Sequence, residues 1–247
     1  MAGAAVLRRL TWVVATVEEV VEETPRVRTI VLDVPDWTGH RAGQHLDVRL
    51  TAEDGYRAER EYSIASAPGE PVAITVERLE DGEVSPYLTQ ELRVGDGIEL
   101  RGPVGGYFVW DGEDAAPLLL VAGGSGVVPL RSMVRHHQRS GSATRVRLLY
   151  SSRTLDDVIY RMELDETGER VEVVYTLTRD HPAGWRGYAR RVDPDLLAEV
   201  AWPVDDGARA FVCGPTSFVE AVAMSLVELG YAPARVKTER FGATGGR

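Results

Sequence analysis

Residues 117–129 read PLLLVAGGSGVVP, a continuous apolar run that ends in a glycine-rich turn. A run without polar alternation is typical of a strand buried on both faces of a parallel sheet. The residues that follow, 130–138, predict a helix, so its N-terminus would lie against the turn. Glycines allow a sharp reversal and a close ligand approach, and a helix N-terminus favours phosphate. The stretch predicts a phosphate-binding turn, although Pro129 replaces the third glycine of the usual dinucleotide fingerprint; the alternative is a purely structural turn.

Strands and helices continue to alternate beyond this stretch. The predicted strands are 146–150, 171–176, 209–213 and 235–238, and the predicted helices are 156–164, 194–200 and 217–229. Regular alternation of this kind predicts a parallel, doubly wound α/β domain.

The first half of the chain has a different pattern, with short β-branched and aromatic runs between turn residues. The predicted strands are 12–17, 27–34, 45–50, 61–65, 72–78 and 97–101. Six strands at this spacing predict a small antiparallel β-barrel. One helical interruption is expected at 86–92, with Ser85 as a candidate N-cap. The acidic stretch 111–114 reads as a linker, which gives two expected domains, 1–112 and 117–247.

Composition excludes several classes of protein. The formal net charge of −10 argues against a nucleic-acid binder, whose affinity depends on neutralising phosphates. The single cysteine, Cys213, excludes a disulfide framework and a four-thiolate zinc or iron–sulfur site within these residues, and no metal site is predicted. No segment approaches the roughly 18–20 apolar residues that span a membrane. Arg8-Arg9 and the residues after it loosely resemble a twin-arginine export signal. The apolar run that follows is too short for such a signal, so we expect a cytoplasmic protein.

Two further short motifs carry polar or reactive groups. Cys213-Gly214-Pro215 follows a later strand of the α/β half, at the same sheet edge as the first glycine turn, with Thr216-Ser217 available to cap the next helix. The alternative is a buried thiol beside a structural turn.

Arg60-Glu61-Tyr62-Ser63 lies on a barrel strand, where Arg60 and Tyr62 share one face. Together they offer a bidentate phosphate ligand and a flat ring; the alternative is an exposed arginine stacked on a tyrosine.

Five motifs occur in one order along the chain: Arg60-x-Tyr62-Ser63, Gly82-x-x-Ser85-x-x-Leu88, Gly102-Pro103-x-Gly105, Gly123-Gly124-x-Gly126-x-x-Pro129 and Cys213-Gly214-Pro215. With these gaps, the series resembles the ferredoxin–NADP reductase family over essentially the whole chain. The resemblance implies a flavin-binding barrel joined to a nicotinamide-nucleotide domain. Families that append a two-iron, two-sulfur domain need cysteines that this sequence lacks.

The resemblance also implies roles for individual residues. In the barrel, the implied FAD contacts are Arg60 at the pyrophosphate, Tyr62 against the isoalloxazine, Ser63 near N5, the adjacent Ile64, Gly82, Val84 and Ser85 around the pyrophosphate, and Arg78 toward the adenine. In the α/β half, the implied nucleotide contacts are Gly124, Ser125, Gly126, Gly214 and Pro215. The catalytic residues are orienting ones, Ser63 at the flavin and Cys213 near the nicotinamide.

The choice between NADP and NAD depends on the loop after the second α/β strand. It reads Ser151-Ser152-Arg153-Thr154, and a hydroxyl beside an arginine suits a 2′-phosphate. NADP is therefore expected, with NAD as the alternative because two aspartates follow. Arg179 resembles a second phosphate contact, or else a solvated loop arginine. Phe241 resembles the aromatic that covers the flavin in many family members, or else ordinary core; the tail 243–247 follows it.

The implied activity is hydride transfer from NAD(P)H to FAD, followed by single-electron transfer to a partner. The expected partner is a small electron carrier such as ferredoxin, or an oxygenase component, and the protein is expected to be a monomer. Two alternatives stay open at this point: an FAD-binding electron-relay subunit without catalysis, and a reductase of free flavin.

Overall fold

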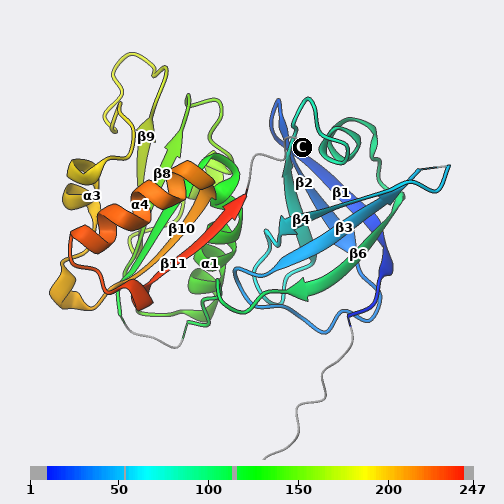
Figure 1. Ribbon diagram of the computed structural model, residues 1–247, viewed down its shortest axis with the longest axis horizontal. Coiled ribbons are helices and arrows are strands. Elements are labelled where there is room, and N and C mark those ends of the chain that lie inside the picture. The colour runs from blue at the N-terminus through cyan, green and yellow to red at the C-terminus, as the bar shows by residue number, and fades with distance from the viewer. Residues whose placement is uncertain (1–9, 53, 113–115, 242–247) are drawn as a thin grey trace, which may run out of the picture.

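The computed structural model describes residues 10–52, 54–112 and 116–241, and the chain forms two sheets that lie side by side (Figure 1). The antiparallel sheet uses strands up to Val104, and the parallel sheet begins at Leu118. Parts of three sequence predictions, Arg8-Arg9, Glu113-Asp114 of the linker, and the tail 243–247, lie outside the described residues. None of the helices within the described ranges has the length and apolar character needed to cross a lipid bilayer.

The first sheet has six antiparallel strands in the order β4-β3-β6-β1-β2-β5. Their bounds are β1 Val13–Thr24, β2 Val27–Asp33, β3 His45–Thr51, β4 Arg57–Ser63, β5 Val72–Glu77 and β6 Gly97–Val104. The sheet curls so that its two edges approach, because Ile64, just after β4, bridges to Ile74 of β5. Aliphatic side chains from all six strands fill the interior. The barrel-like fold predicted for this half is confirmed.

The second sheet has five parallel strands in the order β11-β10-β7-β8-β9. Their bounds are β7 Leu118–Gly123, β8 Val146–Ser152, β9 Val171–Leu177, β10 Arg209–Pro215 and β11 Val236–Phe241. Every residue of β7 is buried, as the unbroken apolar run predicts for a central strand.

Helices cover both faces of the parallel sheet, which confirms the doubly wound arrangement. Their bounds are α1 Val127–Ser140, α2 Arg161–Asp165, α3 Pro194–Val200 and α4 Thr216–Glu228. Leu119 and Val121 of β7 pack with α3 and α4, whereas Leu118 and Leu120 pack with α1. The core on the α1 side also contains barrel residues, among them Ala65 and Trp110. Helix α1 is therefore one of the elements that join the two halves.

Several predicted boundaries differ from the structure. Strand β1 continues to Thr24 instead of ending at Val17, because Val17–Thr24 pairs with β2 in a hairpin, in which Glu18, Glu19 and Glu22 are exposed. Strand β4 was expected at 61–65 but spans Arg57–Ser63, because it pairs with β3 along its length. The last strand was expected at 235–238 and reaches Phe241 through its pairing with β10.

Two helices also differ from their predictions. Helix α1 begins at Val127, because Pro129 falls in the first turn, where a missing N–H costs no helical hydrogen bond. The helix expected at 156–164 begins only at Arg161. Thr154 bonds to Asp157 in a turn, and Tyr160 has a left-handed backbone with φ 60.

The predicted side-chain caps are wrong. The segment at 86–92 is a single π-helical turn, Tyr87–Glu91, with no side-chain cap. The Ser85 hydroxyl instead accepts a hydrogen bond of 3.0 Å from the N–H of Leu79, which closes the preceding turn. Helix α4 begins at Thr216 itself, after Pro215, and neither Thr216 nor Ser217 caps it.

Candidate functional site

A cleft of about 1520 Å³ lies between the barrel and the α/β half. Its walls come from both: β4 and the turn before the π-helical segment on one side, and the carboxyl ends of β7, β8, β9 and β10 on the other. Pockets for one drug-sized ligand usually measure about 300–1,000 Å³. The cleft therefore has room for more than one such ligand.

The barrel wall is built by β4. Tyr62 pairs with Leu46 and packs against the barrel core, and burial raises the pKa of its phenol. Arg60, on the same face, donates a hydrogen bond of 2.7 Å to Oε2 of Glu83. Glu61 lies on the opposite face of the strand, with its side chain 76% exposed, and also borders the cleft. The alternation predicted for this strand is therefore present, and the arginine and the tyrosine ring share one face at the cleft.

The turn 79–85 lies beside β4, where Glu83 bonds to Arg60. The N–H of Gly82 donates to the carbonyl of Leu79 at 2.9 Å, and the hydroxyl of Ser85 lies inside the same turn. Gly82, Val84 and Ser85 all line the cleft. Since Arg60 reaches Glu83, the arginine and the turn form one continuous wall.

The glycine turn after β7 forms the opposite wall. Gly126 packs so tightly on β10 that a Cβ there would lie 2.1 Å from the carbonyl oxygen of Cys213. A Cβ on Gly124 would meet nothing within 4 Å, since this position faces the open cleft. Gly124 and Ser125 line the cleft, and α1 begins directly behind them. A glycine turn that leads into a helix N-terminus is suited to an anionic ligand.

Arginines gather at one end of the cleft, beyond β8 and β9. The N–H of Arg179 donates to the carbonyl of Arg153 at 2.9 Å, so the two loops are held together. Both arginines line the cleft with Ser152, and so does Arg191 from a loop that sequence reasoning did not select. Within the described parts of the chain, none of these three guanidinium groups has a carboxylate partner. In a protein of net charge −10, three unpaired arginines indicate a site for a multiply charged anion.

Cys213 is fully buried in β10, and burial, more than the nearby Glu239, raises the pKa of its thiol well above the ordinary value. The thiol is thus protonated at neutral pH. Gly126 and Gly214 lie at the same edge of the sheet but do not line the cleft, whereas Pro215 does.

Strand β11 brings a carboxylate to the barrel. The Ser63 hydroxyl donates a hydrogen bond of 3.3 Å to Oε1 of Glu239. Burial raises the pKa of Glu239 to about 7, and Glu61 acts in the same direction, whereas the Ser63 bond opposes the shift. Phe241, at the end of β11, packs partly on the core and lines the cleft. Sequence reasoning missed Glu239, because only the tertiary fold places it beside Ser63.

The cleft brings most of the predicted site residues together. Those that line it are Arg60, Tyr62, Ser63, Gly82, Val84, Ser85, Gly124, Ser125, Ser152, Arg153, Arg179, Pro215 and Phe241. Ile64, Arg78, Gly126, Cys213 and Gly214 lie outside the lining. Arg78 bonds to Glu80 instead, and Arg26, which was not selected, lies on the cleft in its neighbourhood.

One group of potential metal ligands lies on the outer face of the barrel. Ligand atoms of His45, Asp47 and Glu61 all lie within 4.8 Å of one another. Oδ2 of Asp47 already accepts two hydrogen bonds from Arg101, so this group reads as an ion-pair network.

Comparison with known proteins identifies both halves of the chain. Residues 14–109 match the family model of the oxidoreductase FAD-binding domain, and residues 120–224 match that of the oxidoreductase NAD-binding domain. The chain is 38% identical over 209 residues to ferredoxin–NADP reductase B of Sorangium cellulosum, covering 81% of this chain and 84% of that protein.

Two further similarities are informative. The chain is 33% identical to the glycine betaine monooxygenase reductase subunit of Chromohalobacter salexigens, over 92% of this chain but only 63% of that longer protein. In structure it resembles the FAD/NAD-binding domain of nitric oxide dioxygenase from Vibrio cholerae, with a TM-score of 0.83, 25% identity, and coverage of 93% and 98% of the two chains. The two domain matches and the extent of the likeness to a ferredoxin–NADP reductase agree with the two-walled cleft: this chain is a member of the ferredoxin–NADP reductase family, with an FAD-binding and an NAD(P)-binding domain.

Proposed function

We propose that the protein is an NAD(P)H-dependent flavoprotein reductase. The observation that carries this proposal is the single cleft with a flavin-type wall, Arg60 and Tyr62, facing a nucleotide-type wall, Gly124 and Ser125. When bound, FAD accepts a hydride from the reduced nicotinamide and releases electrons singly to a partner.

The residues of the barrel wall fit FAD. Arg60 supplies a guanidinium for the pyrophosphate and is now neutralised by Glu83, an exposed carboxylate that the pyrophosphate can replace. Backbone N–H groups and the hydroxyl of the 82–85 turn add further donors. Tyr62 offers a ring whose rotation is restricted by packing, which suits stacking against a flat heterocycle.

The opposite wall fits NADPH. The turn at Gly124 and Ser125 would hold the nicotinamide nucleotide at the start of α1, and Pro215 would complete the wall. Ser152, Arg153, Arg179 and Arg191 would receive the 2′-phosphate. We therefore propose NADPH as the preferred donor, with NADH as the alternative.

Ser63 and Glu239 would orient the two rings, and a proton would be shared between the Ser63 hydroxyl and the Glu239 carboxyl. A carboxyl with a pKa of about 7 is half protonated at neutral pH, so it can donate or accept a hydrogen bond at little cost. Cys213 would contribute as a neutral, buried group beneath the ring. Its role is therefore packing and polarity, not nucleophilic attack.

The proposed partner is a small electron carrier or an oxygenase component. Similarity to a monooxygenase reductase subunit and to a ferredoxin–NADP reductase supports this kind of acceptor. A cytoplasmic location and a monomeric state stay predictions from the sequence.

Anaerobic titration of the purified, FAD-loaded protein with NADPH and with NADH tests the proposal. We expect the flavin absorbance to bleach, and to bleach at lower concentrations of NADPH. A flavin that neither nucleotide bleaches would contradict the proposal and favour the electron-relay subunit. Turnover that requires added free flavin, and no protein acceptor, would favour the flavin reductase.

A further inference from the structure

Helix α1 contacts both walls of the cleft. Its first residue, Val127, follows the glycine turn, and Arg131 lies about one helical turn further along. Nη1 of Arg131 donates a hydrogen bond of 3.2 Å to the carbonyl of Ala65, two residues after Ser63. The hydroxyl of the next residue, Ser132, donates to the carbonyl of Ser66 at 2.6 Å. The nucleotide turn and the flavin strand are thus connected through one turn of one helix.

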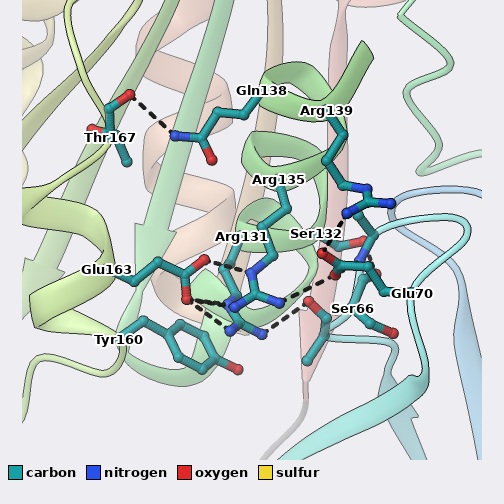
Figure 2. Close-up of polar contacts among 12 residues, drawn as sticks. Ser66, Glu70, Arg131, Ser132, Arg135, Gln138, Arg139, Tyr160, Glu163 and Thr167 are labelled. Atoms are coloured by element: carbon teal, nitrogen blue, oxygen red, sulfur yellow. Dashed lines mark hydrogen bonds and ion pairs between the residues drawn. The ribbon is translucent and has the colours of Figure 1, made fainter. Parts of the chain in front are cut away.

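The guanidinium of Arg131 is itself held on three sides (Figure 2). Its Nε and Nη2 donate to Oε2 of Glu163 at 2.9 and 2.7 Å. Its carbon atom Cζ lies 4.1 Å from the ring centroid of Tyr160, and the side chain is only 7% exposed. The hydroxyl of Tyr160 bonds in turn to Thr75 of β5. Glu163 and Tyr160 both belong to the α/β half, and Tyr160 is in addition hydrogen-bonded to the barrel.

A second arginine extends the contact. Nε of Arg135 donates to Oε1 of Glu163, and its Nη1 donates to Oε2 of Glu70 in the barrel at 3.1 Å (Figure 2). Glu70 in turn accepts a hydrogen bond of 2.8 Å from the N–H of Ala67. The loop that follows Ser63 is therefore bonded to α1 at Ala65, Ser66 and Glu70.

The charges of Arg131, Arg135 and Glu163 are not needed merely to hold the two halves together. The two halves already share an apolar core around α1. A buried ion pair contributes little net stability compared with apolar packing, because desolvating the charges offsets their attraction. What directional hydrogen bonds add to such an interface is a fixed relative position of its two sides.

We propose that Arg131 is a positioning residue, which holds the glycine turn 123–126 at a fixed distance and angle from the strand end at Ser63. This inference rests on the proposed function, because the nicotinamide would lie at the glycine turn and the flavin at the strand end. Hydride transfer requires close alignment of the reacting atoms, and a misplacement of about 1 Å can slow a reaction by about 100-fold. Loss of Arg131 should therefore affect the rate of the reaction more than the binding of either nucleotide.

The control is an arginine with the same kinds of contact within one half. Arg147 bonds to Glu172 at 2.7 Å, donates to the carbonyl of Val200 and lies over the ring of Trp202 at 3.9 Å. All of these residues belong to the α/β half. Arg147→Met therefore removes similar interactions without touching the contact between the halves.

The first measurement is of geometry and needs no cofactor. Cys213 is buried, so spin labels can be placed at Val94→Cys on the barrel and Met224→Cys on α4, which are 63% and 62% exposed. Electron–electron double resonance on the FAD-free protein then gives the distribution of distances between the labels. We expect a narrow distribution with Arg131 and with Arg147→Met, and a broadened or displaced one with Arg131→Met.

The second measurement is stopped-flow reduction of the FAD-loaded protein by NADPH. For Arg131→Met we expect the limiting rate to fall about 10–100-fold while the apparent Kd for NADPH stays near that of the wild type. Arg147→Met should react at the wild-type rate. If Arg131→Met does not fold, Arg131→Lys takes its place, since lysine keeps the charge but lacks the planar fork by which Arg131 bonds to Glu163 through two nitrogens and to Ala65 through the third.

An unchanged distance distribution, or an unchanged limiting rate, in the Arg131 variant would overturn the inference. Wild-type FAD that NADPH and NADH both fail to bleach would instead contradict the proposed function. The two failures are therefore distinguishable, because the first is judged against a wild-type protein that reacts.

Discussion

Ser63 and Glu239 are separated by 176 positions in the sequence, yet the hydroxyl of Ser63 donates a hydrogen bond of 3.3 Å to the carboxylate of Glu239. The bond joins the end of β4 to β11, so it crosses from the barrel to the α/β half. The carboxyl of Glu239 thus lies beside the proposed site of the flavin and nicotinamide rings. Because the pKa of Glu239 is about 7, its titration can be followed directly near neutral pH.

Glu239→Gln should change how stability depends on pH. The pKa of this carboxyl is about 7 in the folded protein against an ordinary 4.5, so the folded state holds its proton more tightly. The free energy of unfolding of the wild type should therefore fall, relative to that of Glu239→Gln, as pH rises from 4.5 to about 7. A shift of this size corresponds to on the order of 3 kcal/mol.

Urea denaturation of both proteins, free of FAD, at several pH values across this window measures the difference. Ser63→Ala provides a second comparison. Because the Ser63 bond lowers the pKa of Glu239, removing it should extend the pH-dependent loss to higher pH. Parallel stability profiles for wild type and Glu239→Gln would show that Glu239 does not titrate in this range.

Arg60→Ala should weaken FAD binding. A charge-assisted hydrogen bond contributes roughly 1.5–3 kcal/mol, which corresponds to about 10–150-fold in Kd. Quenching of flavin fluorescence on titration of the FAD-free protein measures it. Arg57→Ala, at the exposed start of the same strand, is the matched control. Equal FAD affinity in Arg60→Ala and wild type would remove Arg60 from the site.

Arg153→Ala should weaken binding of NADPH much more than that of NADH, because only NADPH carries the 2′-phosphate. Arg191→Ala should act in the same direction, since it lines the same end of the cleft. The measurement is the apparent Kd of each nucleotide from anaerobic flavin reduction. Equal losses for both nucleotides would exclude the 2′-phosphate assignment.

Gly126→Ala should destabilise the fold more than Gly124→Ala. At position 126 the added Cβ would lie 2.1 Å from the oxygen and 2.5 Å from the carbon of the Cys213 carbonyl, so α1 must move away from β10. At position 124 it meets nothing, and only the left-handed φ of +56 opposes alanine, at about 1–2 kcal/mol. Thermal unfolding of the two variants compares them. Similar losses would mean that α1 can shift without cost.

The sequence predicted the two sheets because the pattern of apolar and polar residues along the strands differs between them. Residues 117–122 are apolar without alternation, which distinguishes a strand buried on both faces, whereas Arg60 and Tyr62 alternate with Glu61 on a strand with one face in the core. Boundaries were less accurate. Strand β1 continues through a glutamate-rich stretch because β2 pairs with it, and pairing is not visible in one strand alone.

The sequence alone determined the fold class and the glycine turn, and it selected a set of residues most of which line the cleft, because these depend on local periodicity and on short motifs. Tertiary structure alone decided that Glu239 meets Ser63, that Arg191 lines the same cleft as Arg153, and that Arg131 reaches the carbonyl of Ala65. The physical reason is that these contacts join segments tens to well over a hundred residues apart. No local preference encodes such pairs; they exist only once the apolar core around α1 has closed and placed the two halves together.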